Sequence, residues 1–346
     1  MKKILFILLI GFLLFSCNKK FSLKNNHNFI ILDSLKIEIE ASYICCNDSL
    51  IFMSKKYDSE IVCYDYHGNK LFYFGSKGEG PCEFVNGASN ITIWKNFLVA
   101  VDIPKFRIEL FDLTGKYIND INYTKEMISP IYNIVPFNNK LLIEGLSFSF
   151  DDGTKLTRKT IYIDKNFKIN EISNFVIKKI PSLQSIFKNY NPFNMENNYF
   201  LLDNNMITKK NSDDTLRIYS LQDSFDIYLN FIKPKKIDKE IIDFYSDDSS
   251  MNGKFDIKYS FPKYLPKIKA VYKLNNNLLL LSQYQFIKNS IDKLQNQMYL
   301  YDYNTHEVSI IEIPKVIPIN KIKLIFKDYV FVLYENSITV FKCIIK

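Results

Sequence analysis

Residues 107–121, RIELFDLTGKYINDI, show in one stretch how this chain folds. A run rich in apolar residues ends at Asp112, and Gly115 follows as a turn residue. After Lys116 comes a second run, in which apolar and polar residues alternate. Short runs rich in Ile, Phe, Tyr and Val, separated by Gly, Asn and Asp, are typical of antiparallel strands joined by hairpins. The stretch therefore predicts a β-hairpin.

The same pattern recurs along the whole chain. Residues 61–75 read IVCYDYHGNKLFYFG, residues 160–172 form a degenerate copy, and further copies lie at 216–231, 298–313 and 337–342. A second apolar run precedes each copy, and long helical periodicity is nearly absent. Units of several short strands that repeat along a chain are the signature of a β-propeller. The sequence thus predicts an all-β fold, a six-bladed β-propeller of four-stranded antiparallel blades.

Two details of this propeller follow from the spacing of the copies. Six copies leave about 55 residues per unit, more than the roughly 40–45 of tight propeller repeats, so insertions are expected. We place them at residues 173–195 and at 233–248, where a short amphipathic helix is predicted, both on one rim of the ring. The last unit is short of strands, and we expect the run Phe29–Glu40 to complete and close the final blade.

The first twenty residues are predicted to direct export. Two lysines precede an apolar run from Ile4 to Phe15, and Ser16 and Cys17 follow. The run is shorter than the about 20 residues that span a bilayer, and it has the pattern of a cleaved signal. We therefore expect a signal peptide at 1–16, a tether at 17–28 and the propeller domain at 29–346. Cys17 would then be the first residue after cleavage, either acylated as in lipoproteins or, as the alternative, left as a free cysteine.

Composition and charge exclude some classes of function. The net charge of +8 falls by two when Lys2 and Lys3 leave with the signal, and the remaining lysines are spread out with no basic block. A nucleic-acid partner is therefore not expected. Besides Cys17 the chain has five cysteines, at 45, 46, 63, 82 and 343, with no zinc-binding spacing. We interpret them as small buried residues, with a Cys63–Cys82 disulfide as the alternative.

One longer stretch resembles a known family. Residues 74–118, FGSKGEGPCEFVNGASNITIWKNFLVAVDIPKFRIELFDLTGKYI, are similar to the TolB-like six-bladed β-propeller lipoproteins of bacteria, in which a GxGxGPxEF segment precedes a V-x-D turn, an R-I strand and an F-D-x-x-G hairpin. The matching residues are Gly78, Gly80, Pro81, Glu83, Phe84, Val101, Asp102, Arg107, Ile108, Phe111, Asp112 and Gly115. The chain departs from the family at Cys82, where Gly is usual. The resemblance implies a propeller with a lipid anchor on Cys17, for which Leu14 and Ser16 match the lipobox.

The glycine-rich segment itself does not predict a phosphate site. Pro81 removes an amide donor, Glu83 would repel a phosphate, and no helix pattern follows. We expect it to connect two blades, with Glu79 and Glu83 capping the backbone of the turn as the leading interpretation and facing a ligand as the alternative. Asp102 and Arg107 flank a turn between two strands, where a structural ion pair or a turn-capping role is the leading interpretation and ligand binding the alternative.

Catalytic and metal-binding patterns are sparse. The three histidines, His27, His67 and His306, form no metal motif, and no serine elbow is present, so no catalytic residue is assigned. Asp243, Asp247 and Asp248 are candidate calcium ligands, although their spacing does not match an EF-hand. No cofactor is expected otherwise. Tyrosines at a channel rim could stack on sugar rings.

Two functions from different classes fit these observations. The first is a non-enzymatic envelope lipoprotein that binds a protein, peptide or glycan at the propeller rim or axial channel. The alternative is a metal-dependent hydrolase or lyase on a propeller of the NHL or gluconolactonase kind, for which fold alone is the argument. Because no acidic cluster follows Cys17, the resemblance to lipoproteins implies an outer-membrane anchor facing the periplasm, with cell-surface display as the alternative.

Overall fold

The computed structural model shows an all-β chain made mainly of four-stranded antiparallel sheets. The structure describes residues 23–55, 58–124, 128, 131–137, 139–149, 154–180, 188–190, 199–202, 205–209, 215–219, 224–228, 236–237, 239, 258–259, 268–274, 278–283, 297–302, 305 and 307–346. Within these ranges, no helix has the length and apolar character needed to cross a membrane.

In the described part of the chain, four sheets contain four strands each, and in every one the strands pair in chain order. The first sheet holds β2 (Ala41–Cys46), β3 (Ile51–Lys55), β4 (Ile61–Tyr64) and β5 (Lys70–Phe74). The second holds β8 (Asn90–Trp94), β9 (Phe97–Asp102), β10 (Arg107–Asp112) and β11 (Tyr117–Asn122). The third holds β12 (Ile131–Phe137), β13 (Lys140–Ser149), β14 (Thr154–Ile163) and β15 (Ile169–Ile180), and the fourth β17 (Tyr199–Leu202), β18 (Asn205–Lys209), β19 (Thr215–Tyr219) and β20 (Ser224–Tyr228).

The N-terminal strand β1 (Leu23–Glu38) joins the two remaining sets of strands into one eight-stranded sheet. On one side lie β22 (Ile268–Lys273), β23 (Leu278–Gln283), β24 (Gln297–Asp302) and β25 (Val308–Glu312), and on the other β28 (Ser337–Ile345), β27 (Tyr329–Leu333) and β26 (Ile322–Phe326). The first part of β1 pairs in parallel with β25, and the part from Phe29 onward pairs antiparallel with β28. The expected pairing with the last hairpin is therefore present, but β1 begins at Leu23 and adds a contact with β25.

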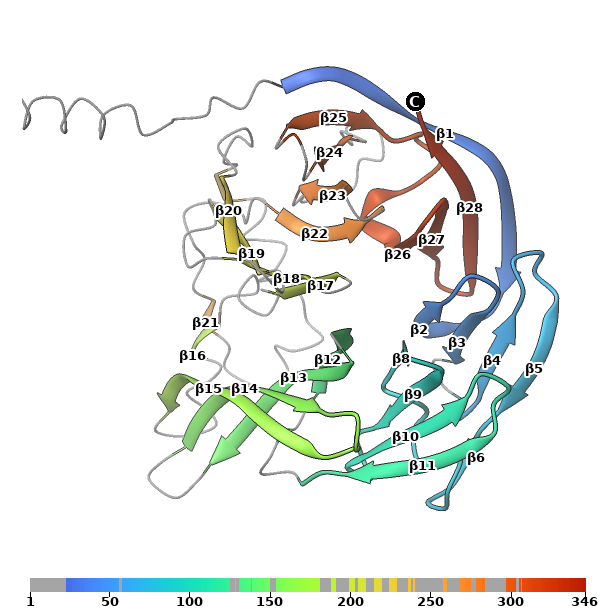
Figure 1. The fold of residues 1–346 in the computed structure, drawn as a ribbon, viewed down its shortest axis with the longest axis vertical. Helices are drawn as coiled ribbons and strands as arrows, with labels where there is room; N and C mark the ends of the chain where they lie inside the picture. Colours follow the sequence, from blue (N-terminus) through green and yellow to red (C-terminus); the bar gives the residue numbers. More distant parts are fainter. Residues whose placement is uncertain are drawn as a thin grey trace, which may run out of the picture.

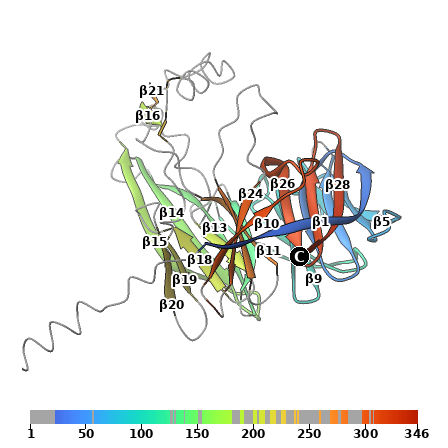
Figure 2. The same ribbon diagram turned by 90° about the horizontal axis from the view of Figure 1, so that it is seen from above.

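The sheets follow one another around a ring, with their first strands toward its middle (Figure 1). Each of the inner strands contacts two others of the same set, in the order β2, β8, β12, β17, β22, β26 and back to β2. The short pair β16 (Lys188–Tyr190) and β21 (Lys258–Tyr259) lies apart from the sheets, on one face of the ring (Figure 2). The predicted insertion at 173–195 is wrong in its first part, because residues 173–180 belong to β15, and the helix predicted at 233–248 lies almost entirely outside the described residues.

Three hairpins explain the repeat seen in the sequence. The carboxylates of Asp65, Asp112 and Asp164 each accept hydrogen bonds from the backbone amides two and four residues later, at 2.8–3.0 Å. The pKa of all three aspartates is lowered. The main cause is a side-chain hydrogen bond from Asn69 for Asp65 and from Thr114 for Asp112, and the backbone amide of Lys168 for Asp164. The chain then turns through a left-handed residue, which is Gly68, Gly115 or Phe167, with φ of 84°, 86° and 61°. The third copy looks degenerate because Phe167 replaces glycine and packs edge-on against Trp94.

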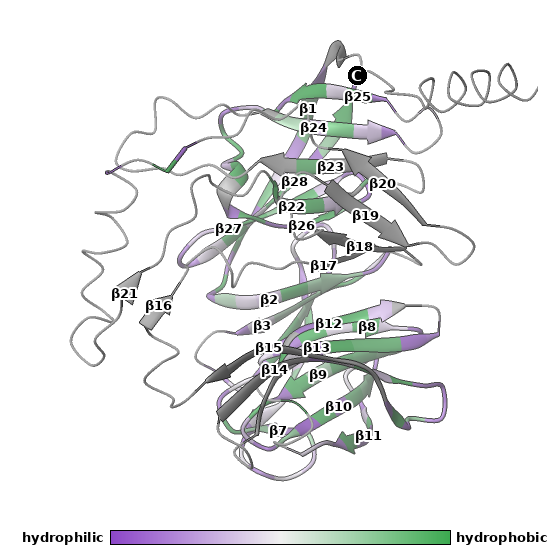
Figure 3. Ribbon diagram, turned by 90° about the vertical axis from the view of Figure 1, so that its left-hand side faces the viewer, coloured by the Kyte–Doolittle hydropathy of each residue, from purple (hydrophilic) through white to green (hydrophobic). Residues whose placement is uncertain are grey.

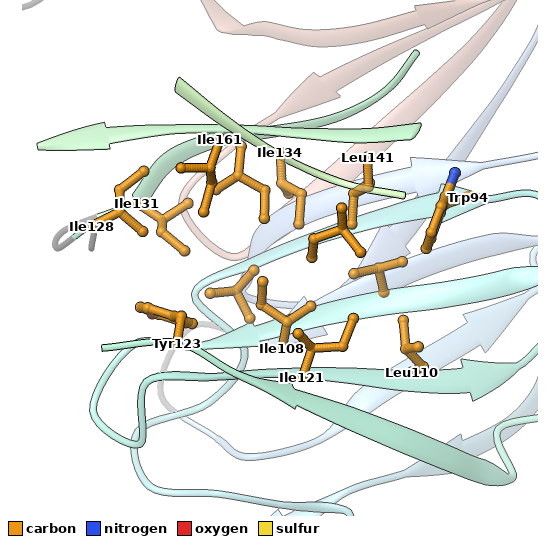
Figure 4. Close-up of a cluster of buried hydrophobic side chains, with 14 residues drawn as sticks. Trp94, Ile108, Leu110, Ile121, Tyr123, Ile128, Ile131, Ile134, Leu141 and Ile161 are labelled. Carbon is orange, nitrogen blue, oxygen red and sulfur yellow. The ribbon is translucent and has the colours of Figure 1, made fainter. Parts of the chain in front are cut away.

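Apolar side chains from facing sheets form the core. Trp94, Ile108, Leu110, Ile121 and Tyr123 of the second sheet and its adjoining loop face the residues Ile128, Ile131, Ile134, Leu141 and Ile161 across the interface with the third (Figure 4). Hydrophobic residues are concentrated in the strands β9 and β10 (Figure 3). Each fully buried aliphatic side chain contributes about 1.5–3 kcal/mol, so contacts between sheets account for much of the stability.

The five cysteines of the described chain carry free thiols, including Cys63 and Cys82. Cys45, Cys63 and Cys343 are buried, as interpreted from the sequence, whereas Cys46 and Cys82 are only half-buried. Burial raises the pKa of Cys63 to about 12. Such thiols are protonated at neutral pH and are therefore poor nucleophiles.

Candidate functional site

The glycine-rich segment connects the outer strand of the first sheet to the inner strand of the second. It runs from Gly75 to Ser89 and contains the short parallel pair β6 (Ser76–Lys77) and β7 (Glu83–Phe84). The amide of Gly80 donates to Glu83 Oε2 at 2.7 Å, which is the capping role expected of Glu83. Gly78 lies so close under this carboxylate that a Cβ would come within 2.1 Å of it. Cys82 has a φ of 62°, a conformation that favours the glycine usual in the similar family.

Two cations of the second sheet hold the carbonyls of this segment. Lys105 Nζ donates to the Gly80 carbonyl at 3.2 Å and to the Glu83 carbonyl. Arg107 donates to the Gly80 carbonyl at 3.3 Å and to the Glu79 carbonyl at 3.4 Å. The segment is therefore fastened to the second sheet through its backbone.

Two buried carboxylates complete this anchor. Asp102 accepts from the Val85 amide at 3.1 Å, and Glu109 accepts from the Cys82 amide at 3.2 Å. Both lie close to Lys105 Nζ, Asp102 at 3.4 Å and Glu109 at 3.0 Å. Burial raises the pKa of Glu109, and hydrogen bonding and charge attraction from Lys105, together with the charge of Arg107, oppose that rise. We call Asp102, Lys105, Arg107 and Glu109 the buried charge cluster.

Asp102 and Arg107 both hold backbone groups of the glycine-rich segment, but they do not form an ion pair with each other. The two residues lie opposite each other on β9 and β10, but Asp102 pairs with Lys105. Arg107 instead lies 3.7 Å from Glu109 and 3.4 Å from Asp120. Lys105 was missed because it stands in the loop between the strands, where no pattern shows that its side chain folds back into the sheet.

A pocket of about 530 Å³ lies next to the first sheet, where the chain passes from β1 into β2. Ile39 and Val62 are buried in its lining and Tyr64 is half-buried, while the charged residues are Glu38, Glu40, Lys55, Asp58 and Lys70. Its volume is in the range of small-molecule and side-chain binding pockets, roughly 300–1,000 Å³. A lining that combines these charged side chains with the apolar Ile39 and Val62 suits a ligand that has both a polar and an apolar part.

The charges around this pocket are partly paired. Lys55 Nζ lies 2.9 Å from Asp58 and also contacts Glu60, and the hydrogen bond to Glu60 is the main reason that the pKa of Lys55 is raised. The hydrogen bond from Lys55 lowers the pKa of Asp58. Glu40 and Lys70 are exposed. Glu38, which pairs with Lys36, and Asp58 are exposed as well. The pocket thus presents three acidic groups and one basic group, Lys70, to solvent.

The glycine-rich segment also braces this pocket. Ser59, next to Asp58, donates its hydroxyl to the Phe84 carbonyl at 2.9 Å, and Ser54 donates to the Ala88 carbonyl at 2.9 Å. Gly87 has a φ of 84° and lies so close to Asp58 that a Cβ would come within 2.6 Å of its carbonyl oxygen. The loop that carries Asp58 is therefore held in place by the segment that the buried charge cluster anchors.

The remaining candidates do not gather into a site in the described residues. Glu79 is exposed, and Asp243, Asp247 and Asp248 lie outside the described ranges. Across those ranges no group of three or more His, Cys, Asp or Glu residues could hold a metal ion. The pocket was missed from the sequence because its residues come from three separate segments. The sequence feature that could have indicated it is Ile39 between Glu38 and Glu40, an apolar residue flanked by two carboxylates.

The chain is similar in fold to solved structures of other proteins. No family model matches the chain, and no curated protein matches it. Among solved structures, a candidate exported protein from Bacteroides fragilis is similar, with a TM-score of 0.54 and 15% identity over 93% of this chain and 95% of that one. A DUF4221 family member from Bacteroides vulgatus has a TM-score of 0.53 and 10% identity over 93% and 99% of the two chains.

The fold is that of a bacterial β-propeller. Virginiamycin B lyase from Staphylococcus aureus, with a TM-score of 0.45 and 9% identity over 91% of this chain and 100% of that chain, is too distant for any inference about activity. The TolB-like resemblance is not established by these comparisons, so membership of that family stays a prediction.

Proposed function

We propose that this propeller is a six-bladed, lipid-anchored binding protein of the cell envelope. Its ligand would be a protein, peptide or glycan, and its acyl anchor would be attached to Cys17 in the outer membrane, facing the periplasm. Six first strands that each contact two neighbours support six blades. The signal pattern and the short distance in sequence from Cys17 to β1, which begins at Leu23, support an anchor close to the propeller.

The pocket beside β2 is the single observation that carries the binding role. Three of the four candidate ligand-binding residues hold the glycine-rich segment through their side chains, namely Glu83, Asp102 and Arg107, and the fourth, Glu79, is exposed. The pocket, by contrast, joins buried apolar side chains to exposed Glu40 and Lys70. We therefore place ligand binding there. A channel-rim site on another blade would be the alternative location.

A photo-crosslinking amino acid at position 70 tests this role in intact cells. We expect adducts with an envelope component at Lys70, and none at the control position Ile118, an exposed residue of β11. The substitution Glu40→Lys, which reverses a charge in the pocket lining, should reduce the adduct several-fold.

Two results would contradict the proposal. Equal adduct formation at positions 70 and 118 would remove the pocket as the binding site. Turnover of lactones, esters or glycosides by the purified chain from residue 18, abolished by a chelator, would favour the metal-dependent hydrolase or lyase instead.

A further inference from the structure

The geometry of β1 points to a fixed orientation on the membrane. We propose that the edge of the propeller along residues 23–32 of β1, where this strand passes from β25 to β28, faces the lipid surface, while the pocket at the other end of β1 is held away from it. This inference rests on the proposed anchor at Cys17, and it adds which surface meets the bilayer.

The tether between the anchor and the fold is short. Leu23, the first residue of β1, follows Cys17 by six positions. At most about 3.3–3.6 Å per residue, the chain between them reaches roughly 20 Å. A domain of this size has a radius of gyration of about 20 Å, so its width is about twice the reach of the tether or more. The tether is therefore too short for the edge of the ring opposite β1 to lie on the lipid.

The strand next to the tether exposes apolar side chains. Ile30 and Leu32 are 36% and 53% exposed, whereas Phe29, on the other face of β1, is 5% exposed and packs in the core. Outward apolar residues near an anchor can enter the headgroup region, which favours an edge-on arrangement over one with a ring face on the membrane. Lys19 and Lys20 of the tether add attraction to anionic lipids.

The far end of β1 reaches the pocket. The strand contains 16 residues, which at about 3.3 Å each follow a path of roughly 50 Å along the outside of the ring. It passes from β25 to the first sheet (Figure 1) and ends at Glu38, a residue of the pocket lining. The same strand therefore separates the lipid-facing edge from the pocket, which leaves the pocket open to a ligand from the aqueous side.

Energy transfer from tryptophan to a labelled lipid tests this orientation. Full-length acylated protein is placed in vesicles of phosphatidylethanolamine and phosphatidylglycerol that contain a small fraction of dansyl-phosphatidylethanolamine. Single reporters are introduced as Leu32→Trp, Ile118→Trp and Tyr73→Trp, all at exposed positions, and the native Trp94 is buried and common to every variant. We expect several-fold more transfer from position 32 than from positions 118 and 73.

The outcomes separate the orientation from the anchor. Equal transfer from positions 32 and 118 would mean that a ring face lies on the bilayer or that the domain tumbles. More transfer from position 73 than from position 32 would mean that the opposite orientation holds. Either result would overturn the inference. Flotation with the vesicles is measured in the same samples. Its loss in every variant would instead refute the proposed anchor, and the orientation with it.

Discussion

Lys105→Met is expected to lower the free energy of unfolding by about 3–5 kcal/mol, the usual cost of removing one partner of a buried ion pair. The Lys105 side chain is 7% exposed, and the carboxylates of Asp102 and Glu109 beside it are fully buried. Methionine fills a similar volume, so the loss arises from the charge and from the hydrogen bonds to the glycine-rich segment. Chemical denaturation at pH 7 measures the change.

The pH dependence of this variant identifies the cause. The folded-state pKa of Glu109 is already raised by burial, and without Lys105 it rises further. A carboxylate whose folded pKa lies above its unfolded pKa costs stability when ionised, and protonation removes that cost. The difference from the native chain should therefore shrink as the pH falls toward 4.5.

A matched control lies on the same sheet. Lys116→Met removes an exposed lysine next to β11 and should change stability by less than about 0.5 kcal/mol. Equal effects of the two substitutions, or a deficit in Lys105→Met that does not depend on pH, would refute the role given to the buried charge cluster.

Removing β1 is expected to have the second large effect. A chain that begins at residue 39 loses the pairing with both β25 and β28, along with the buried side chains of Phe29 and Ile37. Each such side chain contributes about 1.5–3 kcal/mol, and two sheet edges become exposed. Because whole domains are stable by only about 5–15 kcal/mol, we expect loss of cooperative folding, measured by thermal unfolding against a chain that begins at residue 23.

Two further samples keep this test decisive. A synthetic peptide of residues 23–38 should restore part of the transition, since the missing strand can pair in trans. In the full chain, Phe29→Ala should cost about 3–5 kcal/mol. If the chain from residue 39 unfolds at the same midpoint as the longer one, β1 does not close the ring.

The architecture could be predicted because the repeat is local. The Asp, turn and basic residues of each hairpin lie within five positions of one another, so Asp112 and Gly115 show their role without any tertiary contact. The family resemblance likewise rested on residues that stabilise the backbone of their own segment, such as Glu83, whose carboxylate accepts from the nearby Gly80 amide. The pairing of β1 with β25 was not predictable, because parallel partners so distant in sequence leave no local pattern.

The site could be predicted only in part, for the same reason. Asp102 and Arg107 were recognised as charged residues beside a turn, but their partners depend on how the Lys105 side chain folds back. The pocket forms only when the end of β1 is placed beside β3 and β4, which no single segment encodes. Chemistry that arises from the meeting of distant strands therefore had to come from the structure.

The most direct test of the account is the mass of the N-terminal peptide from protein recovered in the membrane fraction. The account predicts a chain that begins at Cys17 and carries acyl groups, and it predicts that Cys17→Ser moves the protein out of that fraction. A chain that begins with an unmodified cysteine, or one that retains residues 1–16, would contradict it.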